Sequence, residues 1–366
     1  MNLFPNKKLK TLKKNFKFLD CTLRDGSYVI NFNFSKLDTK NIVSALDEVG
    51  VDFIEVGHGI GLGASTNKFP KAAAKDEEYM QAASESCIKS KWGMFFIPGI
   101  GSTKDIFKAA NYKMDFIRIG VNIEDYKETE KYIKIAKENS MFVAVNFMKS
   151  YASSPGAFLK ASKFVNKIGA DLVYIVDSAG GMLPHELNQY VQILKKNSNI
   201  HFGFHGHDNL SLSNFNSLLC ISEGAKIIDI SLQGLGRSAG NASFETLIFL
   251  LMRYGFKLKI DPLKLLKISE KYIIPLMSSP GKTKSLDIIS GYSQFHSSYM
   301  PVIDEVSNKF NLDPKELIIA VSAKEKSHVT KELAQKIAKK LKKSKKRNLT
   351  QNNYNFKRYV VNEQDN

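Results

Sequence analysis

The sequence has few cysteines and no long apolar run. Its three cysteines, at positions 21, 87 and 220, are scattered and odd in number. This usage favours a reducing setting without a disulfide framework, so we expect a cytoplasmic protein. No run of about 18 uninterrupted apolar residues occurs, and we therefore expect no membrane span. Residues 1–17 also lack the apolar core of a signal peptide.

Acidic residues are fewer than basic residues, 36 against 53, and two segments near the ends of the chain contain none. The formal net charge is +17, yet residues 1–17 carry six lysines and no acid, and residues 336–347 carry eight basic residues and no acid. The remainder of the chain is close to neutral. Such basic runs are typical of solvated ends, so we expect no specific nucleic-acid partner and at most a loose attraction to polyanions.

Apolar runs alternate with helical patterns along most of the chain. Strands are expected at 16–23, 53–56, 93–97, 116–119, 142–147, 172–176, 200–204 and 227–230. Runs of this kind are typical of strands buried on both faces. Eight strand–helix units in succession predict an α/β fold, a (β/α)8 TIM barrel. A doubly wound open sheet is the alternative, but it needs fewer units and usually has one phosphate-binding loop.

The pattern changes after the eighth unit. Residues 263–276, 290–308, 314–323 and 330–343 all have helical spacing, with no strand between them. We therefore predict a basic leader at 1–15, the barrel at 16–258 and a helical C-terminal domain at 259–343. A polar tail, 344–366, is expected to be poorly ordered.

Polar residues gather where the expected strands end, which is where TIM barrels place their active sites. They are Arg24, Asp25, His58, Asp177, Ser178, His205, His207 and Asn241. The first, seventh and eighth strands are neighbours in a closed barrel, so Asp25, His205, His207 and Asn241 can converge. A carboxylate, two imidazoles and an amide oxygen suit Mn²⁺, with Mg²⁺ or Co²⁺ as alternatives, and Fe²⁺ and Zn²⁺ also fit these ligand types.

Each of these residues also has a purely structural interpretation. Asp25 could cap a loop, and Ser178 and Asn241 could cap the helices that follow them. His58 lies between two glycines and could equally be a hydrogen-bonded structural histidine. The agreement of position and ligand type favours the metal site over these interpretations.

The segment Leu19–Gly26, with the sequence LDCTLRDG, resembles the signature of the DRE-TIM metallolyases. Within that superfamily, the chain is most similar to the 4-hydroxy-2-oxoacid (4-hydroxy-2-oxovalerate) aldolases. The supporting motifs are IEVGHGIGL at 54–62, PGIG at 98–101, VDSAG at 176–180, HGHDNLSL at 205–212 and GRSAGNA at 236–242. The resemblance extends from about residue 18 to about residue 340 and is weaker after residue 291.

The resemblance implies a metal-dependent carbon–carbon lyase that cleaves or forms a 4-hydroxy-2-oxoacid through a pyruvate enolate. It also implies that Asp25, His205 and His207 bind the metal, that Arg24 lies beside the enolate, and that Ser178 holds the substrate carboxylate. His58 is a further substrate-binding candidate. Related aldolases work with an acylating aldehyde dehydrogenase, which is a doubtful partner here because the C-terminal match is weak. A homodimer is the other expected assembly.

Two positions depart from the aldolase pattern. The family has a catalytic histidine where this chain has Tyr28, and a tyrosine where it has His296. One hypothesis is that the pair has exchanged roles, with His296 as the acid/base and Tyr28 as a hydrogen-bond donor. The alternative, which we favour slightly, is that the base has been lost or moved because the substrate differs. An unperturbed tyrosine titrates at about pH 10 and is a poor base at neutral pH.

Two other functions remain open. A Claisen-type acyl-CoA synthase or lyase of the same superfamily usually has glutamine soon after Arg-Asp-Gly, and the lyases have a cysteine in the loop before the last asparagine. Here Ser27 and Tyr28 follow Gly26, and residues 234–241 contain no cysteine. The second alternative is a non-catalytic scaffold that has kept the barrel.

Overall fold

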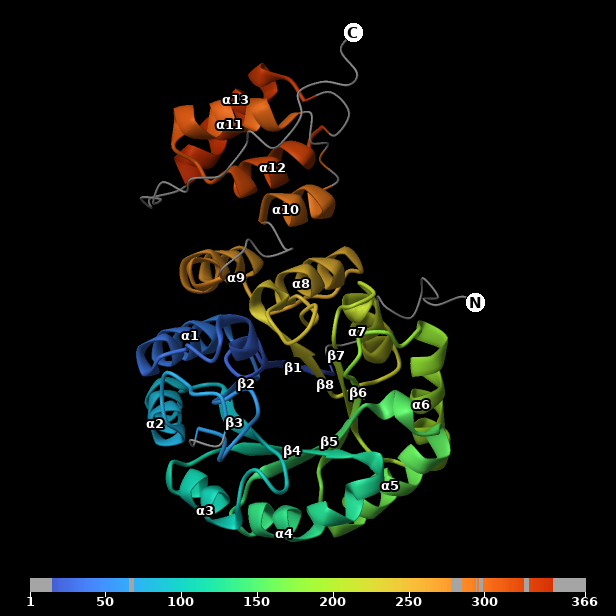
Figure 1. The fold of residues 1–366 in the computed structure, drawn as a ribbon. Helices are drawn as coiled ribbons and strands as arrows, with labels where there is room; N and C mark the ends of the chain where they lie inside the picture. Colours follow the sequence, from blue (N-terminus) through green and yellow to red (C-terminus); the bar gives the residue numbers. More distant parts are fainter. Residues whose placement is uncertain are drawn as a thin grey trace. The chain divides into compact units, whose positions relative to one another are not determined.

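Eight parallel strands close into a barrel in the computed structural model, in the order β1 to β8 with β8 paired back to β1 (Figure 1). The strands are β1 (Lys17–Asp20), β2 (Phe53–Val56), β3 (Lys91–Phe96), β4 (Phe116–Asn122), β5 (Phe142–Met148), β6 (Leu172–Asp177), β7 (Phe202–Gly206) and β8 (Ile227–Ile230). Nearly every strand residue is buried, as a strand covered on both faces requires. The predicted TIM barrel is confirmed.

A helix follows each strand and lies on the outside of the barrel (Figure 1). These are α1 (Lys36–Val49), α2 (Asp76–Ser86), α3 (Thr103–Asn111), α4 (Glu130–Glu138), α5 (Pro155–Ile168), α6 (Pro184–Asn197), α7 (Ser213–Ser222) and α8 (Phe244–Arg253). Their apolar faces join the outward strand residues in one large core cluster. Because each connection returns the chain to the same end of the barrel, the loops after the strands gather at one mouth.

The structure describes residues 15–65, 69–277, 285–293, 295, 299–325 and 329–344. The expected basic leader and polar tail fall almost wholly outside these residues, and so does His296. The chain divides into two compact units, residues 1–282 and 283–366. Among the described residues, no helix is long and apolar enough to cross a membrane.

The first unit extends beyond the eight strand–helix pairs. Helix α9 (Pro262–Ile268), a π-helical turn at Ser269–Ile273 and a 3-10 turn at Ile274–Leu276 replace the single helix expected at 263–276. Helix α9 contacts α1 and α8. The boundary expected at residue 258 therefore falls within this unit, because the first helix after it packs on the barrel.

The second unit is helical. It contains α10 (Ser285–Ser293), α11 (Met300–Phe310), α12 (Pro314–Ser322) and α13 (Lys331–Ser344), with contacts between α10 and α12 and between α11 and α13. The helix expected at 290–308 is thus two helices. Pro301 lies in the first turn of α11, where its missing N–H leaves no hydrogen bond unmade.

Candidate active site

Asp25, His205 and His207 come together at the mouth of the barrel. His205 lies in β7, His207 directly follows that strand, and Asp25 begins the 3-10 helix η2 (Asp25–Ile30) after β1. Because β8 pairs with both β1 and β7, these strand ends are close. One potential ligand atom from each of the three buried side chains lies within 4.8 Å of the others. The sequence-predicted set is therefore assembled in a geometry that one cation could bridge.

Hydrogen bonds orient the two imidazoles. His205 Nδ1 lies 2.7 Å from Asp229 Oδ2, and His207 Nδ1 lies 3.2 Å from the carbonyl oxygen of Gly240. With Nδ1 of each ring so engaged, Nε2 is available as a ligand atom, the arrangement usual for metal-binding histidines. Burial, together with the charge of His205, lowers the pKa of His207 to about 4, so its ring is neutral at pH 7. A neutral imidazole is the form that binds metal.

Asn241 supplies an independent indication that a cation belongs here. Its Nδ2 donates to Asp25 Oδ2 at 2.8 Å, whereas its Oδ1 is buried and has no hydrogen-bond partner among the described residues. A buried polar oxygen without a partner costs about 1 to 3 kcal/mol. A divalent cation beside Asp25 would satisfy this oxygen, so the four residues fit the metal that the sequence implies.

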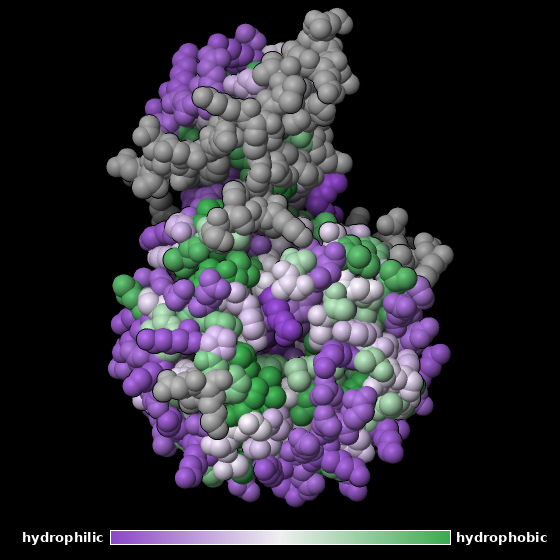
Figure 2. Space-filling view, in the orientation of Figure 1, coloured by the Kyte–Doolittle hydropathy of each residue, from purple (hydrophilic) through white to green (hydrophobic). Residues whose placement is uncertain are grey.

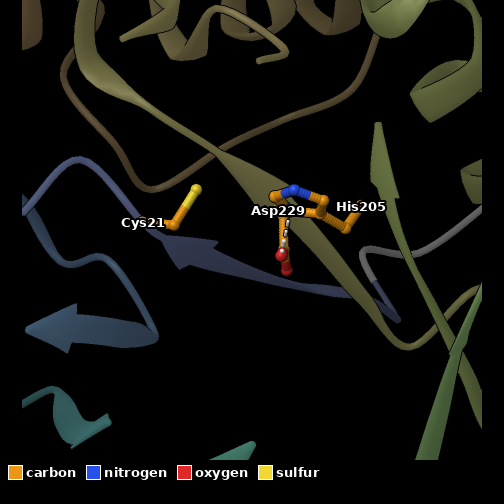
Figure 3. Close-up of side chains that lie close together, drawn as sticks. All are labelled: Cys21, His205 and Asp229. Carbon is orange, nitrogen blue, oxygen red and sulfur yellow. Dashed lines mark hydrogen bonds and ion pairs between the residues drawn. The ribbon is translucent and has the colours of Figure 1, made fainter. Parts of the chain in front are cut away.

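Cys21, His205 and Asp229 form a second group of potential ligands, and their side chains are close together and buried (Figure 3). Burial raises the pKa of the Cys21 thiol well above its usual range, so it stays protonated, and its Sγ donates to the carbonyl of Ile230 at 3.3 Å. Asp229 is already bound to His205 (Figure 3) and to Arg118. We therefore place the candidate metal at Asp25 rather than at this second group.

Arg24 is buried beside the same carboxylate. Its Nε donates to Glu55 Oε2 at 2.7 Å and its Nη1 to Asp25 Oδ1 at 2.6 Å, while its guanidinium lies 4.7 Å from the ring centroid of Phe95. Burial alone would raise the pKa of Asp25, but the Arg24 guanidinium and the imidazoles of His205 and His207 outweigh it and hold that pKa well below its usual range. Asp25 is therefore ionised and ready to bind a cation.

A network of buried ion pairs, which we did not predict from the sequence, holds Arg24 and His205 in place. Arg118 in β4 donates to Glu55 Oε2 at 3.0 Å and also to Asp229 in β8. Glu55 in turn holds Arg24, and Asp229 holds His205. The signal in the sequence was a charged residue inside each of three apolar strands, since Lys, Arg, Asp and Glu are almost never fully buried unless paired.

The mouth contains a cavity of about 320 Å³. Arg24, Asp25, Tyr28, Ser178, His205 and His207 all line it, together with Gly59, Ile60, Phe95, Ile97, Asn146, Met148, Lys149, Tyr151, Val176 and Arg237. Hydrophilic side chains also lie at the centre of the barrel face seen in Figure 2. The structure thus brings most of the predicted site residues around one cavity of the size that a small substrate requires.

His58 is not among the residues that line this cavity, and its expected contact with substrate stays a prediction. Its Nε2 is 2.9 Å from the carbonyl oxygen of Pro70, and its Nδ1 accepts from the N–H of Ile60 at 3.1 Å. Its ring stacks on Phe32 with the centroids 4.3 Å apart. Both ring nitrogens are thus engaged by backbone groups, as the structural interpretation of this histidine predicts.

Tyr28 does line the cavity, and burial raises the pKa of its phenol above the usual value. It is therefore protonated at neutral pH and can donate a hydrogen bond, but it cannot act as a base there. Its proposed counterpart, His296, is outside the described residues.

Comparison with known proteins places the chain in a family. The model of the HMGL-like family matches residues 15–271, which is more than half of the sequence. The chain belongs to the HMGL-like family. The resemblance to metallolyases inferred from the LDCTLRDG segment is thereby confirmed.

Members of the HMGL-like family with assigned activities resemble the chain over most of its length. The 4-hydroxy-2-oxovalerate aldolase of Bacillus cereus is 34% identical over 303 residues, covering 83% of this chain and 89% of the relative. That of Carboxydothermus hydrogenoformans is 33% identical over 308 residues, covering 84% and 92%. The HMG-CoA lyase of Bacillus subtilis shares the fold, with a TM-score of 0.64 at 15% identity, covering 76% of this chain and 99% of that one.

Proposed function

We propose that this protein is a divalent-metal-dependent aldolase that interconverts a 4-hydroxy-2-oxoacid with pyruvate and an aldehyde. The observation that carries the proposal is the clustering of Asp25, His205 and His207 within 4.8 Å, beside the buried guanidinium of Arg24. Relatives that bear the name 4-hydroxy-2-oxovalerate aldolase support the same activity.

The chemistry requires negative charge to be stabilised where it forms. In the cleavage direction, the bond between C3 and C4 breaks, and its electrons pass into the pyruvate enolate. The 4-hydroxyl loses its proton as the aldehyde forms, and the enolate is then protonated at C3. A divalent cation held by Asp25, His205, His207 and Asn241 would supply Lewis-acid stabilisation of that charge, with Mn²⁺ the proposed ion and Mg²⁺ or Co²⁺ the alternatives.

Arg24 is the protein's own donor to the enolate. Its Nε is held by Glu55, whose other partner is the buried Arg118, so the guanidinium is fixed before substrate arrives. A preorganised donor of this kind stabilises developing charge without reorganising during the reaction.

Ser178 is the proposed donor to the substrate carboxylate. Its Oγ accepts from the backbone N–H of Lys149 at 3.0 Å, which fixes the oxygen and leaves the hydroxyl proton free to donate. A neutral donor is suitable here, since Arg24 is already committed to the enolate oxygen.

The base that takes the 4-hydroxyl proton is the open part of the mechanism. Tyr28 is protonated at neutral pH, so we assign it a hydrogen-bond donor role. His296→Ala and Tyr28→Phe, measured separately, distinguish the two hypotheses. If His296 has taken over the acid/base role, its alanine variant loses turnover and Tyr28→Phe loses less; unchanged turnover in His296→Ala rules the exchange out.

A Claisen-type enzyme is the second candidate, but no observation favours it, because neither the glutamine nor the cysteine of those relatives is present in the matching segments. Consumption of an acyl-CoA with release of free thiol would support the Claisen-type function.

We also propose a cytoplasmic homodimer. An acylating aldehyde dehydrogenase is a less favoured partner, and co-purification with the full chain tests it.

The proposed activity is tested by pyruvate release from a panel of 4-hydroxy-2-oxoacids with Mn²⁺. We expect pyruvate and aldehyde in equal amounts from at least one substrate, and loss of both in Asp25→Asn. Absence of pyruvate from every substrate in the panel would point to another reaction.

A further inference from the structure

We propose that the aldehyde half of the substrate carries an anionic group, a carboxylate or a phosphate, and that Lys149 and Arg237 recognise it. The inference rests on the proposed aldolase function and specifies its substrate class. Lys149 directly follows β5, and Arg237 lies in the loop after β8. Both line the cavity that contains Asp25 and Arg24.

The charges around the cavity are unbalanced. Among the described residues, three cationic side chains, Arg24, Lys149 and Arg237, line it, and Asp25 is the one acidic residue that does so. Arg24 is neutralised by its ion pairs with Glu55 and Asp25. In the part of the chain that the structure describes, neither Lys149 nor Arg237 forms an ion pair; the exposed carboxylate of Glu124 accepts instead from Ser153.

Pyruvate does not account for these two cations. A divalent metal and Arg24 would carry three positive charges, and the carboxylates of Asp25 and Glu55 carry two negative ones. One positive charge therefore remains, and the carboxylate of pyruvate balances it. Ser178 is available to donate to that carboxylate. A neutral aldehyde would therefore form no charge-assisted contact with Lys149 or Arg237 and would leave only the exposed Glu124 carboxylate close to Lys149. An anionic aldehyde would meet both cations.

Tyr28 directs one of these cations. The guanidinium of Arg237 lies 5.7 Å from the centroid of the Tyr28 ring, within the range of a cation–π interaction. The Arg237 backbone N–H also donates to Asp25 Oδ2 at 3.3 Å, which ties this loop to the proposed metal site. Tyr28, which stands where the family has histidine, thus places the face of its ring beside Arg237 at the cavity.

The experiment measures aldol addition of pyruvate to aldehydes matched in length but not in charge. Succinic semialdehyde is compared with butanal, and glyceraldehyde 3-phosphate with glyceraldehyde, through the ratio of the two kcat/KM values in each pair. We expect the anionic aldehyde to be favoured roughly tenfold or more, mainly through KM, with the preference falling as salt is raised. The pair with the larger ratio identifies the anion as carboxylate or phosphate.

Variants assign the preference to residues. Lys149→Met and Arg237→Met should each lower the anionic-to-neutral ratio by roughly 3- to 5-fold, since each removes one charge-assisted contact made by an exposed side chain. Lys149→Arg should retain most of the ratio. Lys160→Met is the matched control, because Lys160 lies on α5, is exposed and does not line the cavity. Melting curves confirm that each variant is folded.

The outcomes separate this inference from the function on which it rests. A wild-type ratio near one in both pairs, with neutral aldehydes turned over, overturns the anionic substrate and leaves the aldolase intact. A wild-type preference unchanged in both Met variants overturns the role of Lys149 and Arg237. No addition to any aldehyde, with no pyruvate from any 4-hydroxy-2-oxoacid, overturns both proposals.

Discussion

At the residue scale, Asp25 connects the parts of the site. It accepts from Arg24, from Asn241 and from the backbone of Arg237, and it lies within reach of both imidazoles. No other described side chain joins all of these groups. The loss of its charge should therefore affect metal binding before it affects folding.

Asp25→Asn should weaken Mn²⁺ binding by at least about 100-fold, because a neutral amide replaces the one carboxylate among the proposed ligands. Calorimetric titration of metal-depleted protein measures this directly and requires no substrate. Asp125→Asn, an exposed position outside the cavity, is the control. Equal affinity in the wild type and Asp25→Asn would remove Asp25 from the metal site.

Asp20 predicts a pH dependence that is separate from the metal site. Burial raises its pKa to about 7, although the backbone and side chain of Thr22 donate to it. The folded protein therefore keeps this proton after the unfolded chain has lost it at about pH 4. As a result, this group's contribution to stability is greatest below pH 4, and it is lost as the pH rises to about 7.

Asp20→Asn mimics the neutral acid and should remove this loss. The variant should exceed the wild type by no more than about 1 kcal/mol in free energy of unfolding near pH 4.5, and by roughly 2 to 4 kcal/mol at pH 8. Urea melts at the two pH values test this, with the wild-type protein measured in parallel. The same difference at both pH values would show that Asp20 is already ionised in the folded state.

At the scale of elements, β2, β4 and β8 each contribute one charge to the interior of the barrel. Glu55, Arg118 and Asp229 are fully or almost fully buried. Removing one member of such a group leaves a buried charge uncompensated, which costs about 3 to 5 kcal/mol.

Arg118→Met should therefore lower the free energy of unfolding by about 3 to 5 kcal/mol, and it should also weaken Mn²⁺ binding, because Asp229 loses the partner that helps it hold His205. Chemical denaturation and calorimetry give the two values. Lys134→Met, which breaks the exposed pair with Glu130, should change stability by less than about 0.5 kcal/mol. Similar losses in both variants would argue against the network.

Close packing between β3 and β4 depends on Gly93. A Cβ placed there would lie 2.1 Å from the carbonyl oxygen of Phe116, a backbone atom that cannot move without separating the strands. Gly93→Ala should destabilise the barrel by several kcal/mol, on the order of other severe overpacking changes. Gly156→Ala on α5, where the added Cβ would lie 3.8 Å from Ser154 Oγ, should be neutral or stabilising in the same thermal melts. Destabilisation by both would contradict this account.

The elements themselves were predictable because each strand is a nearly unbroken apolar run followed by a helical period. The pairing of Arg118 with Glu55 and Asp229 could not be predicted, because it depends on which residues of three strands, distant in the sequence, point into the barrel at the same level.

The site was predictable to a similar degree. The His205–His207 spacing and the position of Asp25 after a strand indicated a metal centre. The contact of His58 with the carbonyl oxygen of Pro70, twelve residues away across a loop, could not be inferred from spacing. Lys149 and Arg237 are exposed side chains in loops, and only the three-dimensional structure shows that they face one cavity.

At the scale of the whole molecule, charge is arranged differently at the ends and at the barrel mouth. The basic runs at 1–17 and 336–347 account for most of the net charge of +17. The mouth instead has a specific excess of positive charge around the proposed metal site. This arrangement is suited to an acid substrate that becomes more negative at one atom as a bond breaks, which is the central claim for this chain.

Exchange of the methyl protons of pyruvate with deuterium oxide tests that claim most directly, because it requires enolate formation but no knowledge of the aldehyde. Mass spectrometry follows the gain in mass of pyruvate. We expect exchange that requires Mn²⁺ and falls at least about 100-fold in Asp25→Asn, as expected when the main electrostatic stabilisation of the enolate is lost. Pyruvate that gains no more deuterium with the protein than with Mn²⁺ alone would contradict the proposed enolate chemistry.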